Sequence, residues 1–247
     1  AFRRPVSNDD LAPALEFYAQ GRAERDFETG IQKGLMSILA STNFLYRAEP
    51  GLPPADLPPG SEYAISDLEL AWRLSFFLWS QGPDETLLEL AARGTLHEPA
   101  VLEQQVRRML VDERSRSLVT NFAFQWLGVR RLEAVDPDPR LYPNFDEDLR
   151  RAFIKEMELY LDSILRSNAS VVDLLTASHT FVNERLARLY GLANVRGDQF
   201  RRVELEDAHR QGLFGKGSVL MVTSYPDRTS PVLRGAWIME QILAAPP

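Results

Sequence analysis

The sequence contains no cysteine. This absence excludes disulfides, thiolate metal sites, cysteine nucleophiles and covalent haem attachment through Cys-x-x-Cys-His. Histidine is scarce, since only His97, His179 and His209 occur, far apart and without a His-Glu-x-x-His motif. Only three of the 28 basic residues are lysine, and the basic residues form no long run. Together with a net charge of −7, this pattern argues against a partner made of nucleic acid.

Long apolar runs are also missing. The most apolar stretch, residues 68–79, contains Glu69 and Arg73 and is shorter than the roughly 20 apolar residues that cross a bilayer. We therefore expect no membrane span and interpret this stretch as a buried helix. A composition of 45% hydrophobic and 26% charged residues is typical of a globular protein with a sizeable core. The chain starts with AFRRP and ends with Pro246-Pro247, and we interpret both ends as cuts through a longer chain.

Apolar residues recur at helical spacing along most of the chain. Residues that can cap a helix precede several of these segments, namely Asp26, Ser66, Asn144 and Ser230. The longest predicted helix opens at Asn144 and ends at about residue 166. We expect the apolar stripes to be buried against one another, and they comprise Leu11, Leu15 and Tyr18; Phe27, Ile31, Leu35 and Ile38; Trp72, Phe76 and Trp79; Phe122 and Trp126; and Leu149, Phe153, Met157, Tyr160 and Ile164.

Two features interrupt this helical pattern. Residues 50–60 are rich in proline and cannot continue a helix, so they form the best internal boundary. Residues 200–205 alternate between apolar and polar side chains and predict one short strand. We therefore predict an all-α fold, a multi-helix orthogonal bundle with a proline-rich connector and at most a minor short strand. The predicted domains are residues 1–50, a helical hairpin; residues 61–195, a central helical domain; and residues 205–247, the start of a truncated C-terminal domain.

The glycine-rich segment GLFGKGS (residues 212–218) resembles a phosphate-binding loop only superficially. Gly217 follows Lys216 where serine or threonine belongs, and Arg210 stands where the first glycine belongs. The third glycine of a dinucleotide-binding fingerprint is also missing. We interpret the glycines as residues of a turn with positive φ.

The sequence shows no metal-binding motif. Glu206-x-x-His209 matches half of a di-iron carboxylate motif, but no second copy exists to supply the facing ligands. We therefore expect no metal site and no cofactor in this chain.

One segment, TSYPDRTSPVLRG (residues 223–235), places polar groups at the start of a predicted helix. Amide groups and the helix dipole favour an anion at such a position, and Arg228, Ser230 and Arg234 are the candidate anion-binding residues. The alternative is structural, with Arg228 paired to a carboxylate and Ser230 acting only as the helix cap.

Catalytic residues cannot be assigned from sequence. No Gly-x-Ser-x-Gly or Ser-x-x-Lys motif occurs, although a triad assembled from distant residues leaves no such motif. His179, beside Ser178, is the first candidate for a general base, and His209 and Asp227 are further candidates in a cleft.

Several segments together carry a family resemblance. They are AFRRP (1–5) and STNFLYR (41–47); LELAWRLSFFLWS (68–80), QVRRML (105–110) and NFAFQWL (121–127); and FVNERLA (181–187) and RTSPVLRG (228–235). These three groups resemble tandem domains of unknown function in large planctomycete-type proteins that also carry c-type cytochrome modules. The resemblance covers nearly the whole chain.

The resemblance implies an exported multidomain protein, periplasmic or extracellular, with haem c elsewhere in the full-length polypeptide. Its implied partners are other domains of that polypeptide, including a haem domain. It supplies no catalytic residues.

Two classes of function remain open from the sequence. The first hypothesis is a non-catalytic helical scaffold or interaction module of a larger exported, cytochrome-c-linked protein. The alternative is an enzyme, a hydrolase or a redox-linked one, that acts on a polymer or carbohydrate through a cleft between helices. Paired carboxylates in such a cleft would distinguish the enzyme from the scaffold.

Overall fold

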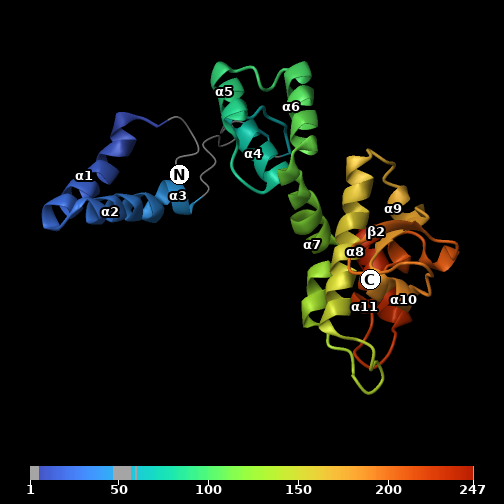
Figure 1. Cartoon of the computed structure of the whole chain (residues 1–247). Coiled ribbons are helices and arrows are strands. Elements are labelled where there is room, and N and C mark those ends of the chain that lie inside the picture. The colour runs from blue at the N-terminus through green and yellow to red at the C-terminus, as the bar shows by residue number, and fades with distance from the viewer. Residues whose placement is uncertain (1–5, 47–56, 59, 247) are drawn as a thin grey trace. The chain divides into compact units, whose positions relative to one another are not determined.

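A computed structural model describes residues 6–46, 57–58 and 60–246 (Figure 1). It separates into two units, Ala1–Phe77 with Gln81–Arg107 and Leu78–Ser80 with Arg108–Pro247. The predicted proline-rich connector lies almost entirely outside the described residues, and so does the AFRRP segment. The predicted domain boundaries therefore stay a prediction.

The first unit is helical, and two of its helices, α4 and α6, continue past Phe77 and Arg107 into the second unit. The helices are α1 (Asn8–Glu24), α2 (Phe27–Ala40), α3 (Thr42–Leu45), α4 (Asp67–Trp79), α5 (Glu85–Arg93) and α6 (Pro99–Val111).

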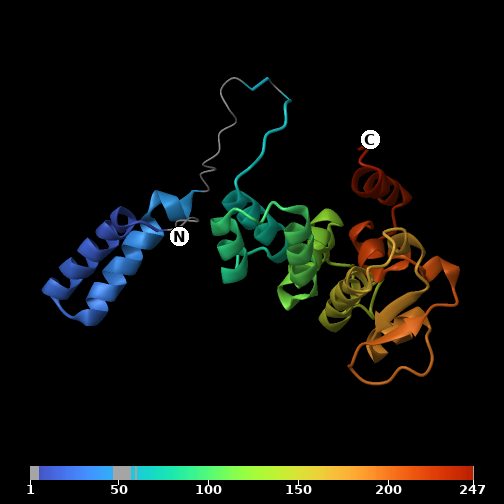
Figure 2. The ribbon, with the colours of Figure 1, turned by 90° about the horizontal axis from the view of Figure 1, so that it is seen from above.

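Helices α1 and α2 lie side by side as a hairpin (Figures 1 and 2). Asp26 caps α2 as predicted, because its carboxylate accepts a hydrogen bond from the amide of Thr29 at 2.8 Å. The helices approach each other at Gly21, where a Cβ atom would lie 2.5 Å from the carbonyl oxygen of Thr29. In α1 and α2, which are fully described, the only buried residues are Gly21, Gly30 and Gly34.

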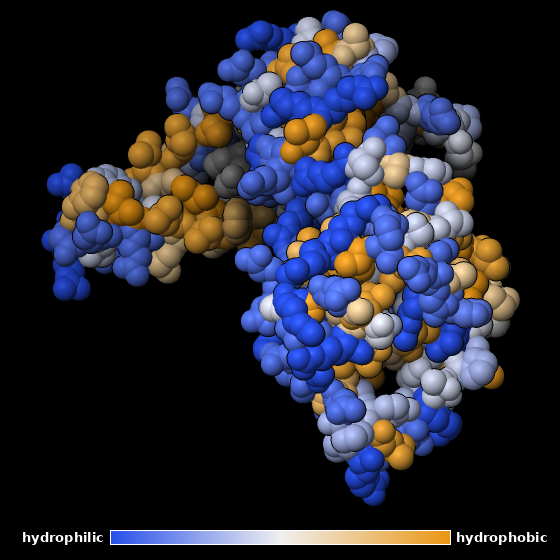
Figure 3. Space-filling model, turned by 45° about the vertical axis from the view of Figure 1, so that its right-hand side comes forward, coloured by the Kyte–Doolittle hydropathy of each residue, from blue (hydrophilic) through white to orange (hydrophobic). Residues whose placement is uncertain are grey.

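The predicted burial of this hairpin's apolar stripes is therefore wrong. Leu15 is 60% exposed and Leu35 is 53% exposed, and Figure 3 shows apolar side chains across the surface of the hairpin. The physical reason is that the two helices meet through glycines, so their backbones are too close to enclose a layer of large side chains.

Helix α4 begins at the predicted cap, Ser66, which forms a capping box with Glu69. The Ser66 hydroxyl accepts from the amide of Glu69 at 3.3 Å, and the Glu69 carboxylate accepts from the amide of Ser66 at 3.2 Å. Asp67 accepts from the amide of Leu96 at 2.8 Å, which joins the start of α4 to the turn that follows α5. Phe76, which the sequence places in the core, is 40% exposed. The α4 helix therefore has one buried face rather than being enclosed on every side.

The second unit surrounds one long helix. Its elements are η1 (Glu113–Arg116), η2 (Leu118–Ala123), α7 (Phe124–Trp126), η3 (Val129–Ala134), α8 (Glu147–Arg166), α9 (Asp173–Thr176), β1 (His179–Val182), α10 (Glu184–Tyr190), β2 (Arg201–Glu204), η4 (Ala208–Arg210), η5 (Leu213–Gly215), α11 (Gly217–Val222), α12 (Pro231–Trp237) and η6 (Ile238–Ile242).

Helix α8 forms the centre of this unit's core. The predicted stripe from Leu149 to Ile164 is buried, and it packs with residues of α7, η3, β1, α10, α11 and α12. Trp237 closes one side, because its Nε1 donates to the carbonyl of Leu127 at 3.0 Å. Phe122 lies outside this core and is exposed, so its predicted burial is wrong.

The start of α8 differs from the prediction by two residues. Asp146, not Asn144, is the N-cap, and its carboxylate accepts from the amide of Leu149 at 2.8 Å. Arg185 holds the preceding turn by donating to the carbonyl of Asn144 at 2.5 Å and to the Asp146 carboxylate at 2.7 Å. This tertiary contact selects the cap.

The sheet has two short antiparallel strands, with His179 opposite Glu204 and Val182 opposite Arg201. The strand expected near residues 200–205 is β2, and its partner β1 was not predicted. A strand needs a partner for its backbone hydrogen bonds, and β1 provides them. The predicted all-α class is confirmed, since helices dominate and the sheet is minor. Among the described residues, no helix has both the length and the apolar composition needed to cross a bilayer.

Candidate functional site

A buried carboxylate lies at the centre of the second unit. Glu156 of α8 is fully buried, three residues after Phe153 and four before Tyr160 on the core-facing side of the helix. Its Oε1 accepts from the hydroxyl of Thr180 in β1 at 2.5 Å, and its Oε2 accepts from the hydroxyl of Tyr190 in α10 at 2.7 Å. Both carboxylate oxygens are thus satisfied by side chains of other elements.

Lys216, just before α11, is the cation of this cluster and is also fully buried. Its Nζ donates to the carbonyl of His179 at 3.2 Å and lies 4.2 Å from the centre of the Tyr160 ring. Burial lowers the pKa of Lys216 to about 8, although the charge of Glu156 acts in the opposite direction. Burial likewise raises the pKa of Glu156, against the charge of Lys216 and the two hydroxyl donors.

Tyr190 joins this cluster to a neighbouring pocket. Its hydroxyl accepts from the amide of Gly217 at 2.8 Å while it donates to Glu156. Burial, and then the negative charge of Glu156, raise the pKa of Tyr190 well above its ordinary value. The guanidinium of Arg210 lies over the Tyr190 ring, 4.5 Å from its centre.

The glycines of residues 212–218 make these contacts sterically feasible. Gly212 has a φ of +58°, which agrees with the predicted turn. At Gly217, however, a Cβ atom would lie 2.1 Å from Cε1 of Phe153, and at Gly215 it would lie 2.3 Å from the backbone carbon of Arg210. Gly215 and Gly217 therefore serve close packing rather than a positive φ, which corrects part of the prediction.

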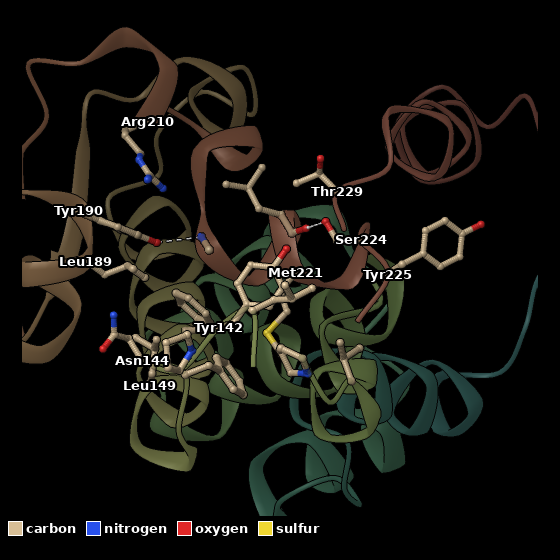
Figure 4. A pocket seen from close by; sticks show the side chains of 18 residues that line it. Tyr142, Asn144, Leu149, Leu189, Tyr190, Arg210, Met221, Ser224, Tyr225 and Thr229 are labelled. Atoms are coloured by element: carbon tan, nitrogen blue, oxygen red, sulfur yellow. Dashed lines mark hydrogen bonds between the residues drawn. The ribbon is translucent and has the colours of Figure 1, made fainter. Parts of the chain in front are cut away.

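The pocket beside Tyr190 has a volume of about 410 Å³ (Figure 4). Its lining is mainly apolar and aromatic, and consists of Val135, Pro137, Leu141, Tyr142, Pro143, Asn144, Phe145, Leu149, Phe153, Leu189, Tyr190, Arg210, Gly217, Leu220, Met221, Ser224, Tyr225 and Thr229. Arg210 is the only ionisable cation in this lining, and no carboxylate or imidazole belongs to it.

Arg150 holds one wall of the pocket in place. It is buried, and it donates to the carbonyl of Leu132, to that of Val135 at 2.6 Å and to the carboxylate of Asp136 at 3.0 Å. Its guanidinium also lies 5.1 Å from the centre of the Phe145 ring. The loop that leads into the pocket is therefore attached directly to α8.

The predicted anion-binding residues have partners within the protein. Arg228 pairs with Asp227 at 3.1 Å, and Arg234 donates to the hydroxyl of Thr223 at 3.4 Å. Ser230 accepts from the amide of Leu233 at 3.1 Å, as a helix cap does. These contacts are those of the structural alternative. The anion site stays a prediction, which a thermal-shift titration with sulfate can test.

The three candidates for catalysis do not come together. His179 lies 3.1 Å from the hydroxyl of Ser163 through Nε2, whereas its neighbour Ser178 donates to Glu204 at 3.0 Å. Burial lowers the pKa of His179, and the positive charges of Arg202 and Lys216 lower it further. His209 is exposed, and Asp227 is paired with Arg228. None of His179, His209 and Asp227 lines the pocket.

The residues present do not fit covalently bound haem, because the chain has no cysteine for a thioether bond. In the part of the chain that the structure describes, no three His, Asp or Glu side chains form a group that could hold a metal ion.

The comparisons with known families agree with the order of the resembling segments. A family model described as PSD4, a protein of unknown function (DUF1592), matches residues 65–192, which is more than half of the chain. The chain belongs to this family. The models PSD5 (DUF1595) and PSCyt3 (DUF1588), both also described as proteins of unknown function, match residues 1–49 and 210–247 of the same chain.

The three names match planctomycete cytochrome-c-associated families, so the predicted resemblance is confirmed. No curated protein and no solved structure matches the chain.

Sequence reasoning missed the cluster of Glu156, Lys216 and Tyr190. Two signals could have found it. Glu156 lies at the helical spacing of the core stripe of α8, and Lys216 is a rare lysine flanked by glycines. The partners of these residues could not be found, because Thr180 and Tyr190 belong to other elements.

Proposed function

We propose that the chain is a non-catalytic helical module that holds other domains of a larger exported polypeptide, including a c-type haem domain. The family resemblance supports an exported setting, periplasmic or extracellular, as part of this proposal. The observation that carries the proposal is the uncovered apolar surface of the α1–α2 hairpin.

Large apolar side chains of both helices form that surface. Every buried position of the hairpin is a glycine, and the exposed large side chains include Leu11, Leu15, Phe17, Phe27, Ile31, Leu35, Met36 and Leu39. Removing apolar surface from water contributes about 25 cal/mol per Å². Exposed apolar surfaces of this kind are typical of sites that contact another protein body.

The family names indicate which partner to test. PSCyt3 is a cytochrome-c-associated name, and its match directly follows the PSD4 match along the chain. Because this chain has no cysteine, c-type haem must belong to another domain. We therefore propose that a haem domain of the same polypeptide binds the apolar surface of the α1–α2 hairpin.

The interior of the second unit supports a non-catalytic role. Glu156 and Lys216 are both fully buried, and both oxygens of Glu156 accept hydrogen bonds from the protein. The alternative, an enzyme for a polymer or carbohydrate, needs carboxylates that reach the substrate. The described pocket has none in its lining.

Binding of the haem domain encoded in the same reading frame tests the proposal. We would measure its affinity for the chain by isothermal titration calorimetry, for the native chain and for Leu15→Gln with Leu35→Gln. Burying two leucines contributes several kcal/mol, so we expect affinity to fall at least about tenfold. Val111→Gln with Val232→Gln is the matched control, since both valines are exposed outside the hairpin.

Equal affinity of the two double variants would contradict the hairpin as the interface. A reading frame without a Cys-x-x-Cys-His motif would contradict the haem partner. Turnover of a polysaccharide by the purified chain would support the enzyme instead.

A further inference from the structure

The pocket in the second unit has a chemistry that the scaffold role does not use. At about 410 Å³ it falls within the range of small-molecule sites. Leu149 and Phe153 of α8 and Met221 of α11 supply apolar surface, and Tyr190 and Arg210 lie together on one side (Figure 4). The pocket is therefore apolar, with a cationic group at one side.

Arg210 has no carboxylate partner among the described residues. It is half-buried, and the contact that the structure gives its guanidinium is the face of the Tyr190 ring. Most other arginines of the second unit, such as Arg150 and Arg185, pair with a carboxylate. The stacked guanidinium keeps a planar array of N–H donors, which matches the two oxygens of a carboxylate.

The one charged side chain in the lining of the pocket is the cation Arg210. Glu156 interacts through space with both Lys216 and Arg210, so one carboxylate lies near two cations. Glu156 is fully buried behind Tyr190, and its two oxygens are already occupied by Thr180 and Tyr190. An anion entering the pocket would balance the second cation without disturbing this cluster.

We propose that this pocket binds a small organic carboxylate, with the carboxylate against Arg210 and an apolar or aromatic body against Leu149, Phe153 and Met221. This inference goes beyond the scaffold role and does not depend on the α1–α2 hairpin. The ligand is held by shape and by one charge, and no bond is made or broken.

A pair of ligands that differ only in charge tests the proposal on the native chain. The probes are 2-naphthylacetate and its neutral amide, 2-naphthylacetamide, titrated by calorimetry and by NMR chemical shifts at concentrations up to several millimolar. For a ligand of this size, a dissociation constant of about 1 mM or lower is expected. Hydrogen bonds to a charged group make the acid about tenfold tighter than the amide.

Substitutions then show which arginine binds the carboxylate of the probe. Arg210→Gln removes the preference for the acid, and Arg210→Lys retains part of it because the charge remains without the planar donors. Arg228→Gln replaces another arginine, which lies over Tyr225, and leaves the preference for the acid over the amide unchanged. Leu189 is an exposed residue of the lining, so Leu189→Trp narrows the pocket and lowers the affinity for both probes alike.

The proposal is overturned if the native chain binds neither probe at several millimolar, or binds both equally. It is also overturned if Arg228→Gln, rather than Arg210→Gln, removes the preference, because the anion would then lie at the loop. The comparison of acid and amide requires no variant, so a variant that fails to fold does not prevent the test.

Discussion

The hydroxyl of Tyr190 donates a hydrogen bond to Oε2 of Glu156, with 2.7 Å between the two oxygens. The same hydroxyl accepts a hydrogen bond from the amide of Gly217 at 2.8 Å. One oxygen atom thus connects α8, α10 and the start of α11, and places the wall of the pocket against the buried cluster.

Tyr190→Phe should lower the free energy of unfolding by about 1–3 kcal/mol, because it leaves a buried amide and a carboxylate oxygen without a partner. Urea unfolding followed by circular dichroism measures the change. Tyr142→Phe is the control, since Tyr142 lines the same pocket but is exposed, and its effect should stay within about 0.5 kcal/mol. Equal effects of the two substitutions would show that the hydrogen bonds of the Tyr190 hydroxyl contribute nothing to stability.

Lys216 predicts an unusual dependence of stability on pH. The unfolded chain holds the Lys216 proton up to its ordinary pKa of 10.5, whereas the folded protein releases it at about 8. Between these values the unfolded state binds more protons, so stability rises with pH, by about 2 kcal/mol between about pH 7.5 and 9.5.

Lys216→Met should remove that rise, and unfolding curves at a series of pH values for both proteins measure the difference. The series must end below pH 10, because the raised pKa of Tyr190 makes stability fall where unfolded tyrosines ionise. The raised pKa of Glu156 acts in the opposite direction, so the difference between the two proteins is the decisive measurement. The same pH dependence in the native chain and in Lys216→Met would mean that burial does not lower the pKa of Lys216.

Gly217→Ala should destabilise the protein by about 1–3 kcal/mol, because its Cβ would lie 2.1 Å from Cε1 of Phe153 and force α11 away from α8. Gly235→Ala is the matched control. Its Cβ meets nothing within 4 Å in α12, so removing a helical glycine should stabilise by about 0.5–1 kcal/mol. Thermal unfolding of both variants measures these opposite signs, and a shift in the same direction for both would contradict the packing role of Gly217.

Arg150→Met should cost about 3 kcal/mol, because the carbonyls of Leu132 and Val135 lose their donor in a buried place. The adjacent Arg151 pairs with Asp148 at the surface, and Arg151→Met should change stability by less than about 0.5 kcal/mol. Hydrogen exchange should also show faster exchange in residues 132–136 of the Arg150 variant. Unchanged exchange there would mean that the loop is held by other contacts.

Features that depend on residues close together in the sequence were predictable, whereas features that depend on distant residues were not. The caps at Asp26, Ser66 and Ser230 were predictable, because the side chain of each accepts a hydrogen bond from the amide three residues later. The Asn144 cap was wrong because a distant residue, Arg185, holds that turn. Strand β1 was missed because its short segment carries no alternation strong enough to predict a strand without its partner.

The candidate site shows the same division. Arg228, Ser230 and Arg234 stood out because they are close in sequence, yet the structure engages each of them in local contacts. Arg210 attracted notice only as the residue that spoils a phosphate-loop motif. Its position over Tyr190 depends on two segments that are twenty residues apart.

By itself, the sequence determined the helical class, the capped helix starts, the core stripe of α8 and the family, because periodicity, caps and motif strings are local properties of the chain. Only the tertiary structure decided that Glu156, Thr180, Tyr190 and Lys216 share one buried cluster beside an apolar pocket. The physical reason is that these side chains come from separate elements, and burial brings charged groups together only where every hydrogen bond is met across the fold.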